Sequence, residues 1–186
     1  MERQSEAARL IVDFLNTNDI ELGTDDIDTP ARLRAWMAAR LGVRRARVDQ
    51  TALRTTLAAR EALRDVLASH NGAPLARGAV AELNRSSRAA QVAVRWDPTG
   101  SASFDATETG PYRALGRIFV AAATCRAEET WDRLKVCPAE DCRAAFYDNS
   151  KNRSGKWCTM RVCGNRSKTR TYRERRRQSA RSPVRR

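Results

Sequence analysis

The sequence of 186 residues predicts a mainly α-helical fold, in which a helical N-terminal domain with one β-hairpin precedes a small cysteine-rich module. Three observations predict it. Apolar residues recur at helical spacing through most of residues 1–134. One segment alternates in the manner of a β-hairpin. Four of the five cysteines fall within residues 137–186.

Caps and breakers delimit the expected helices of the first domain. Residues 5–17 carry apolar side chains at helical spacing. Asp28-Thr29-Pro30 is typical of a helix start, and Gly42 is expected to end that helix. Residues 49–69 predict a long third helix, and residues 76–90 predict a shorter fourth one.

The pattern changes after the fourth helix. Residues 91–96 and 101–104 alternate between apolar and polar side chains, with Asp97-Pro98-Thr99-Gly100 between them, which predicts a β-hairpin. Residues 111–134 return to helical spacing and stop just before Cys137. Because no Ser/Gly-rich linker follows, we expect this last helix to connect the two modules closely.

Positive charge is concentrated at the C-terminal end. The chain holds 35 Lys and Arg residues against 22 Asp and Glu residues, a net charge of +13. Residues 1–136 hold 20 basic and 18 acidic residues (net +2), whereas residues 137–186 hold 15 and 4 (net +11), which together give +13. This asymmetry is typical of a nucleic-acid-binding segment. A solvated basic tail without a specific partner would have the same composition.

Four cysteines form a pattern that suits a metal ion, namely Cys137, Cys142, Cys158 and Cys163. They make two C-x4-C pairs separated by fifteen residues, and two thiolate pairs suit tetrahedral Zn²⁺. A module of about 40 residues cannot build a sufficient apolar core alone, so a metal ion would stabilise it. Two disulfides in an exported protein, or unrelated buried cysteines, are the alternative interpretations. Cys125 is expected to be a small buried apolar side chain.

The module's internal structure can also be predicted. Ala145-Phe146-Tyr147 and Lys156-Trp157 favour two short strands, with a turn over residues 149–155. The basic segment after Cys163 can form a helix with charge on nearly every face. Such a helix gains little from apolar burial, so a metal ion at its start and phosphates along its side would both favour it.

Several classes of protein are disfavoured. No stretch approaches the ~18 apolar residues of a membrane span, and the N-terminus lacks a secretory pattern. We therefore expect a cytoplasmic, nucleoid-associated protein with reduced cysteines and no membrane partner. We find no carboxylate pair at useful spacing, nucleophile motif or phosphate-binding glycine loop. Four protein ligands describe a closed structural zinc site, so we expect no enzymatic activity.

Specific residues around the second cysteine pair carry a family resemblance. They are Trp157-Cys158, Met160 and Cys163-Gly164-Asn165-Arg166, with Asp148, Ser150, Asn152, Ser154 and the C-P-x3-C pair upstream. Together they resemble the CGNR zinc finger. Residues 10–17, with Leu33 and Trp36, resemble the alanine-rich domain of stress-induced transcription regulators that is usually joined to that finger. Gly155 departs from the family pattern, because members often carry a basic residue there, and this puts one phosphate contact in doubt.

The resemblance implies a bacterial transcription regulator that binds double-stranded DNA through a Zn²⁺-bound finger. We expect a helical regulatory domain over residues 1–134, the zinc finger with its basic helix over 135–178, and a disordered basic tail over 179–186. The helical domain would sense an effector, form a homodimer, or both. An RNA-binding protein and a zinc-thiolate redox sensor are the alternative functions.

Two sets of candidate site residues follow. The expected DNA-binding residues are Arg153, Lys156, Arg161, Arg166, Lys168, Arg170, Arg173, Arg175, Arg176 and Arg177. The distal arginines would contact phosphates, whereas Arg161 and Arg166 could read bases, or Arg166 could brace the finger internally. Asp13, Asn16 and Thr17 are polar residues of an apolar helix. They form a candidate effector site, or they brace a neighbouring loop through buried hydrogen bonds.

Overall fold

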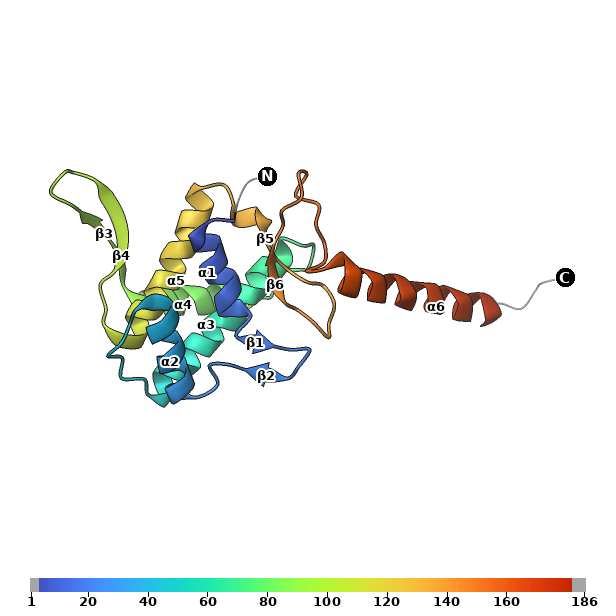
Figure 1. The fold of residues 1–186 in the computed structure, drawn as a ribbon, viewed down its shortest axis with the longest axis horizontal. Helices are drawn as coiled ribbons and strands as arrows, with labels where there is room; N and C mark the ends of the chain where they lie inside the picture. The colour runs from blue at the N-terminus through green and yellow to red at the C-terminus, as the bar shows by residue number, and fades with distance from the viewer. Residues whose placement is uncertain (1–3, 182–186) are drawn as a thin grey trace.

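The computed structural model describes residues 4–181 and confirms a mainly α-helical fold (Figure 1). The helices are α1 (Glu6–Leu15), α2 (Pro30–Leu41), α3 (Gln50–Ser69), α4 (Ala79–Ala90), α5 (Gly110–Ala127) and α6 (Asn165–Arg181). The strands are β1 (Asn18–Asp19), β2 (Thr24–Asp25), β3 (Val92–Trp96), β4 (Ala102–Ala106), β5 (Leu134–Val136) and β6 (Ala145–Tyr147). Each strand pairs antiparallel with its neighbour in sequence, which gives three small two-stranded sheets within residues 4–181.

Side-chain caps start three of the helices, as the sequence indicates. Ser5 Oγ accepts a hydrogen bond from the backbone N–H of Ala8, and Thr29 and Asp49 make the equivalent caps on α2 and α3. Each such cap satisfies a backbone donor that the first helical turn leaves free. Gly42 ends α2 with a φ of 65°, a conformation that favours glycine.

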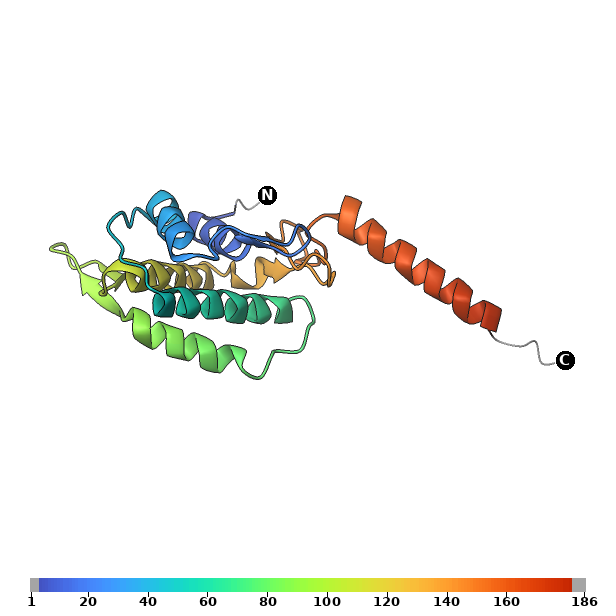
Figure 2. The ribbon, with the colours of Figure 1, turned by 90° about the horizontal axis from the view of Figure 1, so that it is seen from below.

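One apolar core joins helices α1, α2, α3 and α5. Its buried side chains include Ile11 and Phe14 of α1, Leu33 of α2, Leu67 of α3 and Ile118 of α5. Figure 2 shows α3, α4 and α5 running side by side, with α1 and α2 across one side of this layer. Among the described residues, no helix is long and apolar enough to cross a membrane.

The last helix of the N-terminal domain is shorter than predicted. It ends at Ala127, and the chain then forms a short 3-10 turn, Trp131–Arg133, before entering β5. The prediction of a strand at Lys156-Trp157 is also wrong, because β6 pairs with β5. Residue 134, the predicted end of the helical domain, is the first residue of β5.

The β5–β6 sheet ties the C-terminal module to the helical core. Leu134, Val136, Ala145 and Tyr147 are buried in the same cluster as the helices of the first domain. Asn71, just beyond α3, donates hydrogen bonds to the carbonyls of Val136 (2.9 Å) and Lys156 (2.7 Å). The module is therefore packed on the helical domain without an intervening linker.

Helix α6 differs from the other helices in its surroundings. In both views it projects away from the body, with no other element of the described chain beside it (Figures 1 and 2). It extends to Arg181, three residues past the predicted end of the basic helix. Of the predicted disordered tail, residues 182–186 lie outside the described residues.

Candidate metal centre and basic helix

The four cysteine side chains meet at one point between β5 and α6. Cys137 follows β5 directly, and its backbone N–H bonds the carbonyl of Ala144 at 2.9 Å. Cys142 lies in the turn that returns to β6, and Cys163 lies in a π-helical turn, Met160–Gly164. The Sγ atoms of Cys142 and Cys163 each lie 3.6 Å from that of Cys158.

The spacing of the sulfur atoms fits a tetrahedral metal site. All four Sγ atoms lie within 4.8 Å of one another. Four sulfurs at about 2.3 Å from a central tetrahedral ion would be about 3.8 Å apart. Three of the four residues are buried, so the cluster is largely shielded from solvent.

The thiols differ in their readiness to ionise. Burial raises the pKa of Cys142 to about 11 and also raises the pKa of Cys158. Although burial opposes it, the pKa of Cys163 is lowered, because Arg166 Nη2 donates a hydrogen bond to its sulfur at 3.4 Å. One guanidinium can stabilise one thiolate, but four thiolates in a buried cluster need a central cation. The donor set therefore fits a divalent, thiolate-binding metal ion.

A buried ion pair shapes the loop that carries Cys158 to this cluster. The Nζ atom of Lys135 lies 2.7 Å from Asp148 Oδ2 and also bonds the carbonyls of Arg153 and Gly155. Asp148 accepts further bonds from the backbone of Ser150 and Gly155. Although burial would raise it, the pKa of Asp148 is lowered to about 2 by these partners, with Lys135 foremost.

Gly155 has a packing role in this loop. A Cβ atom at Gly155 would lie 2.5 Å from Oδ1 of Asp148, too close for any side chain. The glycine lets its N–H approach the carboxylate at 2.8 Å. This close approach to Asp148 explains why a glycine stands at position 155, where members of the CGNR family often carry a basic residue.

We expect Lys135→Met to destabilise the protein strongly. Asp148 would keep its burial and lose its cationic partner, and an uncompensated buried charge costs about 3–5 kcal/mol. Urea unfolding followed by circular dichroism measures the loss. Lys151→Met is the matched control, because Lys151 is exposed on the same loop. Equal unfolding midpoints for the two variants would contradict the role given to the buried pair.

The segment Cys163-Gly164-Asn165-Arg166 forms the junction between the metal cluster and α6. Gly164 is buried, and a Cβ there would lie 2.4 Å from the sulfur of Met160. Asn165 Nδ2 bonds the carbonyl of Arg161, which closes the turn at the start of α6. Each residue of the segment therefore has a structural task at the base of the helix.

Arg166 braces the finger internally, the alternative that the sequence left open. Its guanidinium contacts Glu21 Oε1 at 3.0 Å, Asp141 Oδ2 at 3.2 Å and the sulfur of Cys163 at 3.4 Å. Glu21 lies in the β1–β2 loop of the helical domain. The side chain is held by three partners within the chain, which favours bracing over base reading for Arg166.

The other candidate DNA-binding residues lie on the exposed surface. Five basic residues are exposed along α6, namely Lys168, Arg170, Arg173, Arg176 and Arg177. Arg175 also lies on α6, but its side chain is not among those that the structure describes. Arg161 is exposed at the base of α6. Arg153 and Lys156 are exposed on the loop before Cys158, and Lys156 Nζ lies 5.7 Å from the ring centre of Trp157.

The candidate effector residues do not converge on one cavity. Asp13 pairs with Arg40 on the surface at 3.3 Å. Asn16 exchanges two hydrogen bonds with the backbone of Ala145 in β6, at 2.9 and 2.8 Å. Thr17 is buried and accepts a bond from Arg60. Asn16 and Thr17 thus act as braces, which is the structural alternative that the sequence left open.

We expect Asn16→Ala to weaken the attachment of the finger to α1. The backbone N–H and C=O of the buried Ala145 would lose their partners, at a cost of about 1–3 kcal/mol. The urea midpoint should fall, while metal content stays at the wild-type level. Asn84→Ala, on the exposed side of α4, is the control and should be nearly neutral. A wild-type midpoint for Asn16→Ala would refute the brace.

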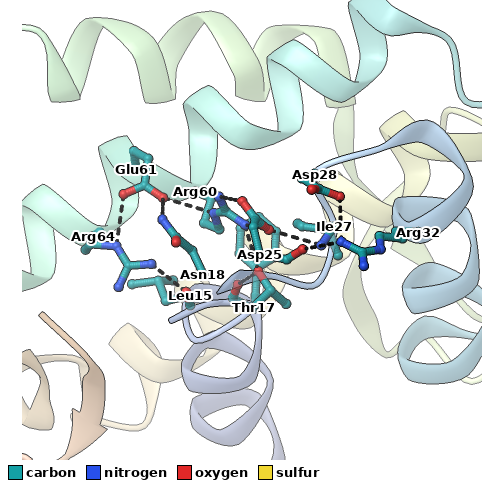
Figure 3. A network of polar contacts seen from close by, with 11 residues as sticks. Leu15, Thr17, Asn18, Asp25, Ile27, Asp28, Arg32, Arg60, Glu61 and Arg64 are labelled. Carbon is teal, nitrogen blue, oxygen red and sulfur yellow. Dashed lines mark hydrogen bonds and ion pairs between the residues drawn. The ribbon is translucent and has the colours of Figure 1, made fainter. Parts of the chain in front are cut away.

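Sequence reasoning missed a buried polar network beside these residues (Figure 3). Arg60 bonds both carboxylate oxygens of Asp25, at 2.8 and 2.6 Å, and Arg64 bonds Glu61 at 3.0 Å. Arg64 also donates to the carbonyls of Leu15 and Arg143. The only sequence signal was two arginines four residues apart on a long helix, and such a pair usually faces solvent.

The network has an electrostatic signature. The pKa of Asp25 is lowered although burial opposes this, mainly because Arg60 bonds its carboxylate. The pKa of Glu61 is lowered in the same way by Arg64 and Arg60. Because Arg64 reaches Leu15 at the end of α1 and Arg143 in the finger, the network joins α1, α3 and the metal-binding module.

Comparisons with known proteins agree with this arrangement. The family model described as "CGNR zinc finger" matches residues 133–176. The model described as "ABATE: Putative stress-induced transcription regulator" matches residues 8–130, more than half of the chain. No curated protein matches the chain. The chain therefore belongs to the ABATE family and carries a CGNR zinc finger at its C-terminal end.

Proposed function

We propose that this protein is a DNA-binding transcription regulator whose finger holds one Zn²⁺ ion through Cys137, Cys142, Cys158 and Cys163. One observation carries the proposal: a basic helix, α6, projects from the metal cluster with no other element of the described chain beside it (Figure 2). The family supplies the regulatory context, and the chemistry of α6 supplies the partner.

The exposed side chains of α6 suit a polyanion. Five exposed basic residues lie along its described part, and Tyr172 is its exposed aromatic residue. A helix of 17 residues is about 25 Å long, and its width fits the major groove of B-DNA, which is about 12 Å wide. Phosphate contacts along such a helix release counterions and stabilise the complex.

The metal ion would set the orientation of this helix. Zn²⁺ neutralises thiolates, and its chemistry here is structural, because all four ligands come from the protein. Cys163 lies in the turn that leads into α6, and Arg166 bonds its sulfur. The cluster and Arg166 thus fix where α6 leaves the body, so that its side chains reach DNA in a constant geometry.

The helical domain has a direct contact with the base of α6. Glu21, from the β1–β2 loop, pairs with Arg166, and the network around Arg60 begins at Asp25 on β2. A change in the helical domain that moves this loop would alter the support of α6. Regulation by an effector of the helical domain would act through these contacts.

Genome-wide mapping of DNA bound by the protein in its source cells tests the proposal. We expect localised peaks at promoters, and their loss when Cys158 is replaced by serine. Parallel recovery of bound RNA provides the contrast. A flat DNA profile together with enriched RNA would reject the regulator in favour of an RNA-binding protein.

A further inference from the structure

The β3–β4 hairpin projects from the body at the end opposite to α6 (Figures 1 and 2). Its pairing places Val92 opposite Ala106, Val94 opposite Phe104 and Trp96 opposite Ala102. Because alternate residues of a strand share a face, all six apolar side chains lie on one face of the hairpin. Ala106 is buried against Gly116 of α5, but the face becomes exposed toward the tip.

The exposed apolar surface on this hairpin is large for its size. The exposed fractions are 52% for Val94, 72% for Trp96 and 56% for Phe104. Phe104 also lines a groove of about 570 Å³, in which Leu10 of α1 and Val120 of α5 lie among charged residues such as Arg40 and Arg117. Contiguous apolar surface of this kind marks an interaction site.

The outer edge of β3 is open for pairing. The N–H of Thr107 bonds the carbonyl of Gln91, and the N–H of Asp97 bonds the carbonyl of Ser101, so odd-numbered residues of β3 face β4. The backbone groups of Val92, Val94 and Trp96 therefore point to the free edge. On β4, by contrast, Arg113 already bonds the carbonyl of Ala106.

We propose that β3 pairs antiparallel with β3 of a second copy of this chain, about a two-fold axis at Val94. In this register Val94 lies opposite Val94 of the other copy, and Val92 lies opposite Trp96. The outward N–H and C=O groups of all three residues then form hydrogen bonds with the other strand. The result is a four-stranded sheet with one continuous apolar face. A two-fold interface of this kind is self-complementary and closes at two subunits.

Charge and side-chain packing at the seam agree with a second copy as the partner. The polar face carries Arg95 and Asp105, which pair with each other at 3.3 Å, so it brings no net charge to the interface. The seam brings Val92, Val94 and Trp96 of one β3 strand beside those of the other, whereas Phe104 lies one strand away from it on β4. Backbone hydrogen bonds therefore supply most of the contact, and we expect a dimer that dissociates at about micromolar concentration.

The dimer would leave both α6 helices free at the far ends of the assembly. The proposal of a dimer does not depend on the proposed function, because the hairpin is remote from the metal cluster and from α6 (Figure 1). Loss of the dimer would therefore leave the binding of one finger to DNA intact.

Sedimentation velocity of the metal-loaded full chain without DNA, from about 1 to 100 µM, tests the dimer. We expect Val94→Pro to weaken it more than tenfold, because proline removes an outward N–H that the hairpin itself does not use. Trp96→Lys should weaken it similarly by placing charge on the apolar face. Ala93→Lys, on the opposite face of the same strand, is the control and should dimerise like the wild type.

The outcomes separate the possible occupants of this surface. A wild-type protein that stays monomeric throughout would overturn the proposal and assign the hairpin to another partner. A dimer that Trp96→Lys abolishes and Val94→Pro leaves intact would overturn strand pairing, since the association would then be apolar contact alone. Circular dichroism and metal content, measured on each variant, confirm that loss of the dimer is not loss of the fold.

Discussion

Replacing Cys158 with serine is expected to abolish metal binding and to unfold the chain between β6 and the start of α6. The loop over residues 148–157 and the turn Met160–Gly164 have few buried apolar residues of their own, and the cysteine cluster joins them, with the Lys135–Asp148 pair as the loop's other support. With one ligand lost, the metal ion is no longer held in a closed site, and burial, which raises the pKa of Cys142 to about 11, favours protonation of that thiol. Structural zinc contributes about 10–16 kcal/mol to the folding of comparable small modules.

The helical domain should survive this substitution. Sheet β5–β6 is held by Asn16, Asn71 and Arg64, whose contacts do not involve a cysteine side chain. Elemental analysis should give one zinc per wild-type chain and none in the variant. Proteolysis should then cut the variant between residues 148 and 165, and leave α1 to α5 intact. Full zinc content in Cys158→Ser, or collapse of the whole chain, would contradict the division between a metal-held loop and a packed domain.

Arg166→Gln should produce a milder form of the same defect. The variant loses the cation beside Cys163 and the link to Glu21, so zinc should dissociate faster in the presence of a chelator. Arg170→Gln is the control, because Arg170 is exposed one turn further along α6. It loses the same positive charge without losing the contacts that Arg166 makes, so the comparison separates the two effects. If both variants kept zinc equally well, Arg166 would return to the candidate DNA contacts.

Neutralising the basic residues of α6 is the second change for which we expect a large effect. Replacement of Lys168, Arg170, Arg173, Arg176 and Arg177 by glutamine should lower DNA affinity by about a thousandfold or more. Each lost phosphate contact should reduce the slope of log K against log salt by about 0.9, so the full set of five removes about 4.5 units. Fluorescence anisotropy at several salt concentrations measures both quantities.

The control for this variant carries the same change in net charge. Glutamine replaces five exposed arginines of the helical domain, and this change should leave the salt slope near the wild-type value. The five are Arg34, Arg44, Arg45, Arg47 and Arg77.

Arg161→Gln adds a second contrast. Its exposed side chain at the base of α6 suits base reading, so it should cost about 1–3 kcal/mol of discrimination with little change on scrambled DNA. Equal slopes for the α6 variant and the control would show that α6 is not the contact.

The helices were predictable because their signals are local. Ser5, Thr29 and Asp49 cap the helices that the sequence predicted, and Gly42 ends α2. The metal cluster was predictable for a similar reason, since the ligand spacing within each pair is short. These features depend on neighbours in sequence and not on the tertiary fold.

The contacts that join the two modules could not be predicted from local pattern. Arg64 and Arg143 meet across 79 positions of the chain, and Asn16 and Ala145 across 129. A polar side chain in a helix has the same sequence signal whether it faces water or a distant carbonyl. The strand β5 was missed because residues 128–136 continue the apolar spacing of α5, although the chain leaves the helix at Ala127.

The most direct test of the DNA-binding proposal is a titration of the zinc-loaded full chain, at several salt concentrations, on three ligands. They are a duplex recovered from a bound promoter, a scrambled duplex of equal length, and single-stranded RNA of the same sequence. The proposal predicts that the promoter duplex binds at least about a thousandfold more tightly than the other two at physiological salt. Equal affinity for all three, or tighter binding of the RNA, would contradict it.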